Sequence, residues 1–328
     1  MPSKTFIRSA LAALGAGAAL AVTVTALPAH AGADDGWQSA GKGKTSGISG
    51  IAVAGGGNLE DGVDAVIVRD NKDADENRIA SVTYEDGKKP DVDALDWKGG
   101  ELPSDLEALD DVPGEKGGYL AVASSGAAYH LKVADGVAEV VDTFTLPAVE
   151  SGDEVENFAL GAPPSSAAPG RTKASAREGK LVAVWGGRGE DDRPATLHAA
   201  PVSFDSAGES HFGDVESAQV TSPYPTEHVR HASDTKLTDS GALQVSSASD
   251  PGDDGPFDSA VYTAGHVTLT GSGGVKLSVT KDPEALKKFD KHKIEALACL
   301  PGSDKAVLGT DDENGGGSLT TADGLCGG

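Results

Sequence analysis

The feature that most constrains the fold is a short pattern of residues that occurs twice, far apart in the chain. Leu106–Leu109 reads apolar-Glu-Ala-Leu, and a Pro-Gly turn and the apolar run Tyr119–Ser124 follow it. Ile294–Ala298 has the same pattern, again followed by a Pro-Gly turn and an apolar run, Lys305–Thr310. Each copy predicts a β-strand, a tight turn and a second strand. An internal repeat of this kind predicts a fold assembled from similar units.

Related openings divide the chain into five units, at intervals of roughly 50 to 75 residues. They begin at Ile48, Leu106, Val155, Val229 and Ile294. Within each unit, short stretches alternate apolar and polar residues and are broken by Gly, Pro and Asp, which is the pattern of β-strands. Four-stranded units of this length are typical of propeller blades. The sequence therefore predicts an all-β propeller with five antiparallel four-stranded blades, or six if residues 170–222 hold two.

The fifth unit is too short to supply four strands by itself. We therefore expect a strand from the N-terminal segment, around Trp37, to complete the last blade. Residues 32–45 are then a leader or closing strand, and 46–328 form a single propeller domain. Helix is expected only over residues 282–293, where Pro, Glu, Ala, Leu and Lys favour a short helical segment.

The first 31 residues predict a secretory signal peptide. Lys4 and Arg8 precede the apolar stretch 11–27, and Ala29-His30-Ala31 fits a cleavage site. We therefore expect a secreted, extracellular protein with no membrane span. Because exported proteins oxidise their thiols, the only two cysteines, Cys299 and Cys326, are expected to form a disulfide bond.

The charge balance limits the class of partner. The chain has 51 acidic residues against 27 Lys and Arg, a net charge of −24. Nucleic-acid binding depends on positive charge that displaces counterions, so nucleic acid is excluded as a partner. The acidity favours either simple solubility or the binding of cations, calcium above all, since calcium takes oxygen ligands. We expect a monomer whose partner is an extracellular ligand or protein that the sequence does not identify.

The innermost strand of each blade lines the central channel of a propeller. Alignment of the five openings places one polar residue of each at the same level: Ser49, Glu107, Glu156, Arg230 and Glu295. Three carboxylates near one axis are costly without a compensating cation. The pattern predicts either a polar ligand-binding site, with or without a metal, or a water-filled channel whose Glu side chains accept backbone N–H groups of the next blade.

The loops after the second strands should lie at one end of this channel. They carry Asp70, Asp250, Asp311 and Asp312, which are suitable ligands for calcium. Of these, we take Asp70, Asp311 and Asp312 as the metal-site candidates. The alternative is that acidic residues in turns serve solubility alone.

The openings resemble those of exported bacterial β-propellers described as phytase-like or as having esterase-like activity. The likeness is carried by Ile48–Ala52 with Val66–Asn71, by Leu106–Leu109 and by Ile294–Ala298. The resemblance implies a five- or six-bladed ring, often with calcium and in some members with phosphoester hydrolysis. Phosphate would then be held by Lys and Arg, for which Arg69, Arg188 and Arg230 are the candidates at the rim.

Two functions follow as hypotheses. The first is a non-catalytic extracellular binding or interaction module. The alternative is a calcium-dependent phosphoester hydrolase, with Glu107, Glu156 and Glu295 or the acidic rim holding calcium and Arg230 holding an anion. No nucleophile motif is present, and the sequence leaves open whether the protein is an enzyme.

Overall fold

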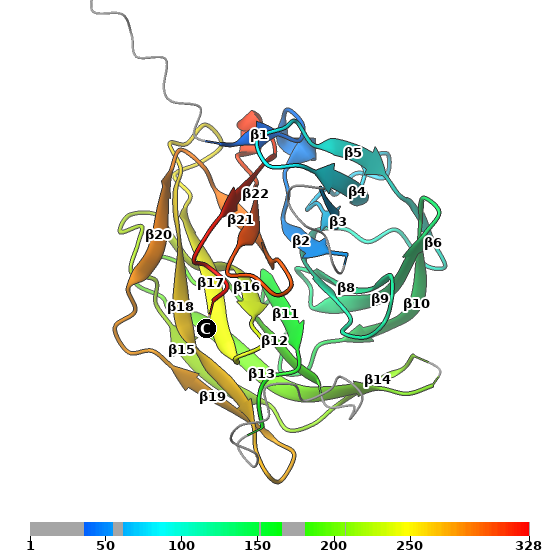
Figure 1. Cartoon of the computed structure of the whole chain (residues 1–328), viewed down its shortest axis with the longest axis vertical. Coiled ribbons are helices and arrows are strands. Elements are labelled where there is room, and N and C mark those ends of the chain that lie inside the picture. The colour runs from blue at the N-terminus through cyan, green and yellow to red at the C-terminus, as the bar shows by residue number, and fades with distance from the viewer. Residues whose placement is uncertain (1–35, 55–61, 151, 166–180, 207, 328) are drawn as a thin grey trace, which may run out of the picture. The chain divides into compact units, whose positions relative to one another are not determined.

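Five β-sheets follow one another along the chain in the computed structural model and surround a common centre (Figure 1). The structure describes residues 36–54, 62–150, 152–165, 181–206 and 208–327. The predicted signal peptide, residues 1–31, and the first part of the predicted leader lie outside the described residues. Within them, no helix is long and apolar enough to cross a bilayer.

Each sheet begins with its innermost strand and is built outwards. The first sheet contains β2 (Gly50–Val53), β3 (Val63–Val68), β4 (Ile79–Tyr84) and β5 (Asp91–Ala94). The second contains β7 (Leu106–Asp111), β8 (Gly118–Ala123), β9 (Ala127–Ala134), β10 (Val137–Thr145) and β6 (Asp96–Lys98). The third contains β11 (Asn157–Gly161), β12 (Leu181–Gly186), β13 (Ala195–Phe204), β14 (Ser210–Phe212) and β15 (Glu216–Val220). The fourth contains β16 (Val229–Leu237), β17 (Ala242–Ser249), β18 (Asp258–Leu269), β19 (Val275–Val279) and β20 (Ala285–Asp290). The fifth contains β21 (Ile294–Cys299), β22 (Ala306–Thr310), β23 (Ser318–Ala322) and β1 (Gln38–Ser39).

The innermost strands form a closed ring. β2 contacts β7, β7 contacts β11, β11 contacts β16, β16 contacts β21, and β21 returns to β2. Five hydrophobic clusters fill the structure, and each draws its residues from two neighbouring sheets. The protein is therefore a five-bladed β-propeller, as the five openings predicted, and the six-bladed alternative does not apply.

The second strand of the third blade shows why the sheets pack in this way. All of β12 is buried, and its side chains alternate between two interfaces. Val182 and Val184 pack against the fourth blade, whereas Ala183 and Trp185 pack against residues of the second. Successive side chains of a strand point to opposite faces, so an uninterrupted apolar strand needs a neighbour on each side. A ring of sheets supplies both neighbours.

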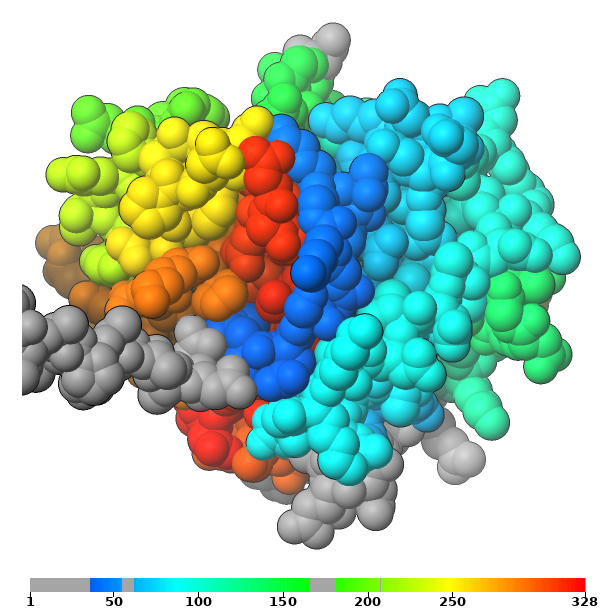
Figure 2. All heavy atoms as spheres, turned by 90° about the horizontal axis from the view of Figure 1, so that it is seen from above, coloured from blue at the N-terminus to red at the C-terminus, as the bar shows by residue number. Residues whose placement is uncertain are grey.

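The N-terminal strand completes the fifth blade. β1 pairs antiparallel with β23, with Gln38 opposite Leu319. Figure 2 shows this blue N-terminal segment lying against the red C-terminal blade. The neighbouring Trp37 packs its ring 4.4 Å from that of His292 and 6.1 Å from that of Phe289. The predicted closing strand is thus confirmed.

The predicted helix was wrong. The segment 282–293 contains no helix, because Ala285–Asp290 is the strand β20, which pairs with β18. The long strand β18 leaves backbone groups unpaired beyond β19, and pairing with them outweighs a weak local preference for helix. The alternating stretch 91–97 is divided between two strands. Its second part lies in β6, which pairs parallel with β10 of the next blade.

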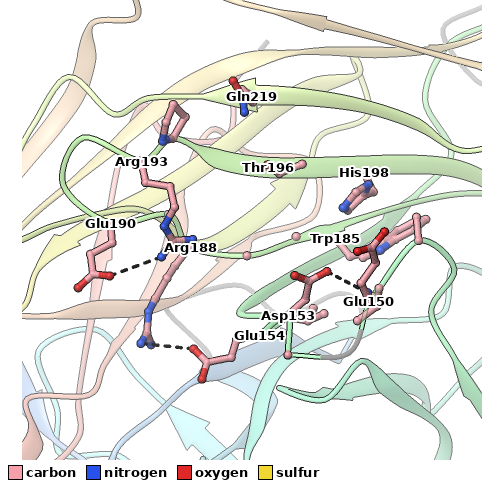
Figure 3. Close-up of a pocket in the computed structure, with 18 residues that line it drawn as sticks. Glu150, Asp153, Glu154, Trp185, Arg188, Glu190, Arg193, Thr196, His198 and Gln219 are labelled. Carbon is pink, nitrogen blue, oxygen red and sulfur yellow. Dashed lines mark hydrogen bonds and ion pairs between the residues drawn. The ribbon is translucent and has the colours of Figure 1, made fainter.

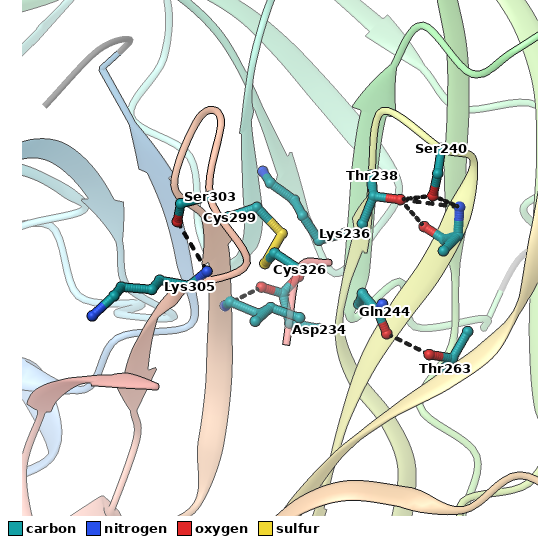
Figure 4. The surroundings of a disulfide bond; sticks show 12 residues. Asp234, Lys236, Thr238, Ser240, Gln244, Thr263, Cys299, Ser303, Lys305 and Cys326 are labelled. Carbon is teal, nitrogen blue, oxygen red and sulfur yellow. Dashed lines mark hydrogen bonds between the residues drawn. A yellow bond between two sulfur atoms is a disulfide. The ribbon is translucent and has the colours of Figure 1, made fainter. Parts of the chain in front are cut away.

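The predicted disulfide bond between Cys299 and Cys326 is present, with the two Cα atoms 5.6 Å apart. Cys299 ends β21, and Cys326 lies beyond the last strand of the same blade. Figure 4 shows the bond close to Lys236 and Asp234 of the fourth blade. The bond therefore ties the C-terminal segment to the inner part of the ring.

Reduction of this disulfide is expected to lower the free energy of unfolding by roughly 3 to 4 kcal/mol. The bond spans a sequence separation of 27 residues, and a loop of this length loses considerable entropy in the unfolded chain when it is closed. Urea unfolding with and without dithiothreitol measures the difference. The Cys299→Ala/Cys326→Ala variant serves as the control, because its urea midpoint should be the same with and without dithiothreitol. An unchanged midpoint on reduction would contradict the prediction.

Candidate functional site

The innermost strands begin at one end of the channel, where charged side chains from all but the first opening gather. We call this group the axial mouth, and it consists of Asp70, Glu107, Glu156, Arg188, Arg230, Lys293, Glu295 and Asp311. The three glutamates predicted to converge do so, because Glu156 and Glu295 both act electrostatically on the carboxyl of Glu107. Asp70 acts on it as well. The axial mouth therefore brings three further carboxyl groups, from three other stretches of the chain, within electrostatic range of Glu107.

Bulges in the innermost strands set the direction of two of the glutamates. In β7 the register passes from Leu106 opposite Ala123 to Ala108 opposite Val122, so Glu107 is an extra residue. In β21 the register skips Glu295 in the same way. A bulge re-aims the side chain of the extra residue and is common beside functional sites. The repeated apolar-Glu-Ala-Leu pattern thus marks a repeated bulge, which simple alternation does not predict.

Three cations neutralise part of this charge. Arg188 Nη1 lies 3.1 Å from Glu156 Oε1. Its Nη2 lies 3.7 Å from Glu154 Oε2 (Figure 3). Arg230 forms ion pairs with Asp250 and, at 3.3 Å, with Glu295. Both guanidinium groups are therefore already engaged by two carboxylates each.

Lys293 is the third cation, and its side chain is only 1% exposed. Its Nζ lies among four carboxylates: Glu313 at 2.5 Å, Glu295 at 3.4 Å, Asp311 at 3.6 Å and Asp250 at 3.9 Å. Burial lowers the pKa of Lys293, but Glu295 and Asp311 outweigh it and raise the pKa above its ordinary value. The residue was not among the predicted site residues because it lies in the segment expected to be helical. Its position directly before the last apolar-Glu-Ala-Leu pattern was the available signal.

Two carboxyl groups of the axial mouth have no such partner. Within the described part of the chain, neither Glu107 nor Asp70 makes a hydrogen bond or an ion pair. Burial, followed by Glu156 and Glu295, raises the pKa of Glu107 well above its usual range. Burial and the neighbouring Glu295 raise the pKa of Asp70 to about 6. Burial and Glu295 likewise raise the pKa of Asp311 to about 8, although Asp311 lies beside Lys293.

The remaining predicted residues differ in their surroundings. The hydroxyl of Ser49 is buried and has no hydrogen-bond partner. The guanidinium of Arg69 is partly buried, which lowers its pKa, and its Nε has no hydrogen-bond partner. Asp312 accepts hydrogen bonds from His292 Nδ1, the Thr310 hydroxyl and the Lys293 backbone N–H. Asp312 therefore holds the loop together and does not join Asp70 and Asp311.

The oxygen atoms of the predicted metal ligands are not gathered tightly. Among the described residues, only Asp205, Glu209 and His211 form a group of three or more with ligand atoms all within 4.8 Å of one another. This group is exposed on the hairpin between β13 and β14, away from the predicted ligands. A small metal ion at the axial mouth would therefore require Asp70, Glu107 or their neighbours to move closer together.

A second polar layer lies further along the innermost strands. Asp110 Oδ2 accepts the backbone N–H of Leu160 in the next blade, at 2.8 Å. Asp234 Oδ2 accepts the N–H of Leu297 in the next blade, at 2.7 Å. Lys236 forms an ion pair with Asp110. The alternative hypothesis for the glutamates was that they accept backbone N–H groups of the next blade. In the structure, Asp110 and Asp234 make these hydrogen bonds.

Comparisons with known proteins add little to this description. No protein-family model and no curated protein matches the chain. Among solved structures, Sqt1 of Saccharomyces cerevisiae is 10% identical, over 82% of this chain and 81% of that one, with a TM-score of 0.35. The PQQ domain of pyranose dehydrogenase from Coprinopsis cinerea is 9% identical, over 88% and 95% of the two chains, with a TM-score of 0.41. A glycoside hydrolase is 10% identical, over 86% and 62%, with a TM-score of 0.45.

These similarities are too distant to carry a functional argument. The assignment of a propeller rests on the five sheets and their closed ring. A propeller serves either as a binding module or as an enzyme, and the fold alone does not distinguish these. The comparisons do not show the phytase-like resemblance, which stays a prediction.

Proposed function

We propose that this protein is an extracellular binding propeller that takes up a cationic ligand at the axial mouth. The proposal is supported by one observation above all: within the described residues, the buried carboxyl group of Glu107 lies among other carboxyl groups and makes no hydrogen bond or ion pair. Asp70 likewise makes no hydrogen bond or ion pair within the described residues, and its pKa is raised even though Lys293 and Lys72 act to lower it. Carboxyl groups held together in this way favour either protonation or a bound cation.

Lys293 shows how the fold stabilises carboxyl groups that are gathered in this way. Its ammonium group lies within 4 Å of four carboxylates. In the part of the chain that the structure describes, no ammonium group forms an ion pair with Glu107 or Asp70, although Lys72 acts on both at longer range. We infer that the ligand supplies this charge, either as calcium or as a primary amine. An amine suits oxygen atoms that are more widely spaced than calcium ligands.

The cation is expected to raise the melting temperature of the wild-type protein. A ligand at about 100 times its Kd stabilises the folded state by about 2.7 kcal/mol, which corresponds to a shift of about 5 °C or more for a domain of this size. Calcium chloride and putrescine are the two probes, each added after treatment with EDTA, with thermal unfolding followed by circular dichroism.

The Glu107→Gln variant is expected to lose this shift, since it replaces the unpaired carboxyl by an amide of nearly equal size. Glu139→Gln is the matched control, because Glu139 is exposed on β10 and should leave the shift intact. If neither probe stabilises the wild type, or if both variants behave alike, the proposed function is wrong. A shift with one probe alone identifies the type of cation.

The alternative function is a calcium-dependent phosphoester hydrolase. The axial mouth contains both carboxylates and guanidinium groups, which is the combination that such chemistry uses. However, Arg230, the expected anion ligand, is held by Asp250 and Glu295, and Arg188 is held by Glu154 and Glu156. The binding role therefore has the better support. Calcium-dependent cleavage of p-nitrophenyl phosphate that Glu107→Gln abolishes would favour the hydrolase instead.

A further inference from the structure

If the axial mouth takes up a cation, as proposed above, its free carboxyl groups limit the kind of cation. Four carboxyl groups act on that of Glu107: those of Glu156, Glu295, Asp70 and Asp105. Three of these are already paired with resident cations: Glu156 with Arg188, Glu295 with Arg230, and Asp105 with Lys72. Within the described residues, Glu107 and Asp70 therefore remain for a ligand. Neither residue is fully buried, so a ligand can reach them from solvent.

The spacing of the carboxyl oxygens disfavours a metal ion. Calcium binds roughly six to eight oxygens at about 2.3–2.6 Å, so its ligand oxygens lie within roughly 5 Å of one another. Among the described residues, only Asp205, Glu209 and His211 offer three ligand atoms within 4.8 Å of one another, and none of them belongs to the axial mouth. Calcium at Glu107 and Asp70 would therefore need water for most of its ligands, or a movement of the innermost strands.

The strands beside Glu107 leave little room for such a movement. A Cβ atom on Gly50 of β2 would lie 2.7 Å from the backbone nitrogen of Leu109 and 2.9 Å from Cα of Ala108, both in β7. The backbones of the first two blades are thus in direct contact one residue beyond Glu107, and close-packed interiors resist displacement. The ligand must therefore suit the spacing that the ring already has.

Lys293 shows which cation suits carboxyl groups with this spacing. Its ammonium group lies 2.5 to 3.9 Å from four carboxylates. In the described part of the chain, these four also fail to bring three oxygens within 4.8 Å of one another. An ammonium group donates three hydrogen bonds and still forms ion pairs at N–O distances up to about 4 Å. The same end of the ring therefore already accommodates one ammonium group.

We propose that Glu107 and Asp70 bind a primary alkylammonium group and discriminate against calcium. The raised pKa values of both groups favour one proton shared between them, so a single positive charge matches the pair better than two. The ammonium group donates to the two carboxyl groups and to water, and the resident ion pairs stay intact. Small amines and the lysine side chain of a peptide share this chemistry, and the experiment distinguishes the two sources.

Isothermal titration calorimetry at pH 7.5 tests the assignment, with protein treated with EDTA and then freed of it. Methylammonium is expected to bind at least about tenfold more tightly than calcium chloride or tetramethylammonium, because tetramethylammonium carries the charge without an N–H donor. Nα-acetyl-lysine methylamide and ethylammonium represent the two sources. Whichever of these two binds more tightly identifies the source, and either result supports the proposal.

Two substitutions test the recognition itself. Glu107→Gln and Asp70→Asn should each weaken methylammonium binding about tenfold, because each removes one charged acceptor. Glu139→Gln should leave the affinity unchanged, since Glu139 is exposed on β10. Circular dichroism shows whether each variant is folded.

Tighter binding of calcium than of every amine would overturn the ammonium assignment but leave the cation-binding function in place. Equal affinity for methylammonium and tetramethylammonium would have the same meaning, since charge alone would then explain binding. Unchanged affinity in both variants would place the amine elsewhere and reject the assignment. If none of the cations binds, the proposed function fails together with it.

Discussion

Replacement of Lys236 by methionine is expected to lower the free energy of unfolding by about 3 to 5 kcal/mol. The Lys236 and Asp110 side chains are 9% and 1% exposed, and Lys236 also acts on the buried carboxyl of Asp234. Even with this cation present, burial raises the pKa of Asp110 to about 6. Without it, two carboxyl groups that bond to backbone of neighbouring blades would be buried with no compensating charge.

Urea unfolding at pH 7 measures this loss. Lys276→Met is the matched control, because Lys276 is exposed on β19 and should change stability by no more than about 0.5 kcal/mol. A double variant, Lys236→Met/Asp110→Asn, is expected to recover part of the lost stability by removing the unpaired charge. A loss below about 1 kcal/mol for Lys236→Met would show that this pair is far better hydrated than its burial indicates.

The second large effect is a fall in stability as the pH rises from about 4.5 to 8.5, measured in EDTA. The pKa values of Asp70, Asp311 and Glu107 are all higher in the folded protein than in the unfolded chain. Between the ordinary carboxyl pKa and these raised values, the folded state therefore binds more protons than the unfolded state. Stability is then highest at the acidic end of this window and is lost as the pH rises through the folded pKa values.

The size of this effect follows from the pKa of Asp70, which is raised less than that of Asp311. Asp70 rises from 3.8 to about 6, which corresponds to about 3 kcal/mol, and Asp311 adds to it in the same direction. Urea unfolding at a series of pH values measures the slope. Glu107→Gln should be more stable than the wild type at pH 8.5 and should show a shallower slope, whereas Glu139→Gln should follow the wild type. Stability that is constant or increases across this window would contradict the electrostatic description of the axial mouth.

These two predictions also show why the polar layers of the channel differ in their consequences. Asp110 and Asp234 accept backbone N–H groups and are compensated by Lys236. Removing Lys236 should therefore lower the free energy of unfolding. The axial mouth keeps Glu107 and Asp70 unpaired, so removing a charge there should stabilise the protein and remove binding. Stability given up at a site in this way is typical of functional residues.

The sequence was informative wherever the deciding interaction is local or repeated. Alternation of apolar and polar residues predicted the strands, and the five openings predicted five blades, because each unit repeats the same short-range pattern. The shortness of the fifth unit predicted that a strand near Trp37 would complete it. The same alignment predicted that Glu107, Glu156 and Glu295 lie at equivalent positions along the channel. The ligand that they bind is a proposal.

Other features depend on contacts between segments that are distant in the chain. The region 282–293 has a local preference for helix, yet it forms β20 because β18 offers unpaired backbone groups beside it. Lys293 becomes the central cation only because the fourth and fifth blades bring Asp250, Glu295 and Asp311 around it.

The sequence by itself indicated the all-β class, a propeller of five or six blades and an N-terminal segment able to close the ring, since these follow from the repeated pattern along one chain. Only the tertiary structure decided which charged groups are paired. Ring closure sets the distances between innermost strands. Within the described residues, those distances determine that Arg188, Arg230 and Lys293 form ion pairs while Glu107 and Asp70 do not, a property that no pattern of residues encodes.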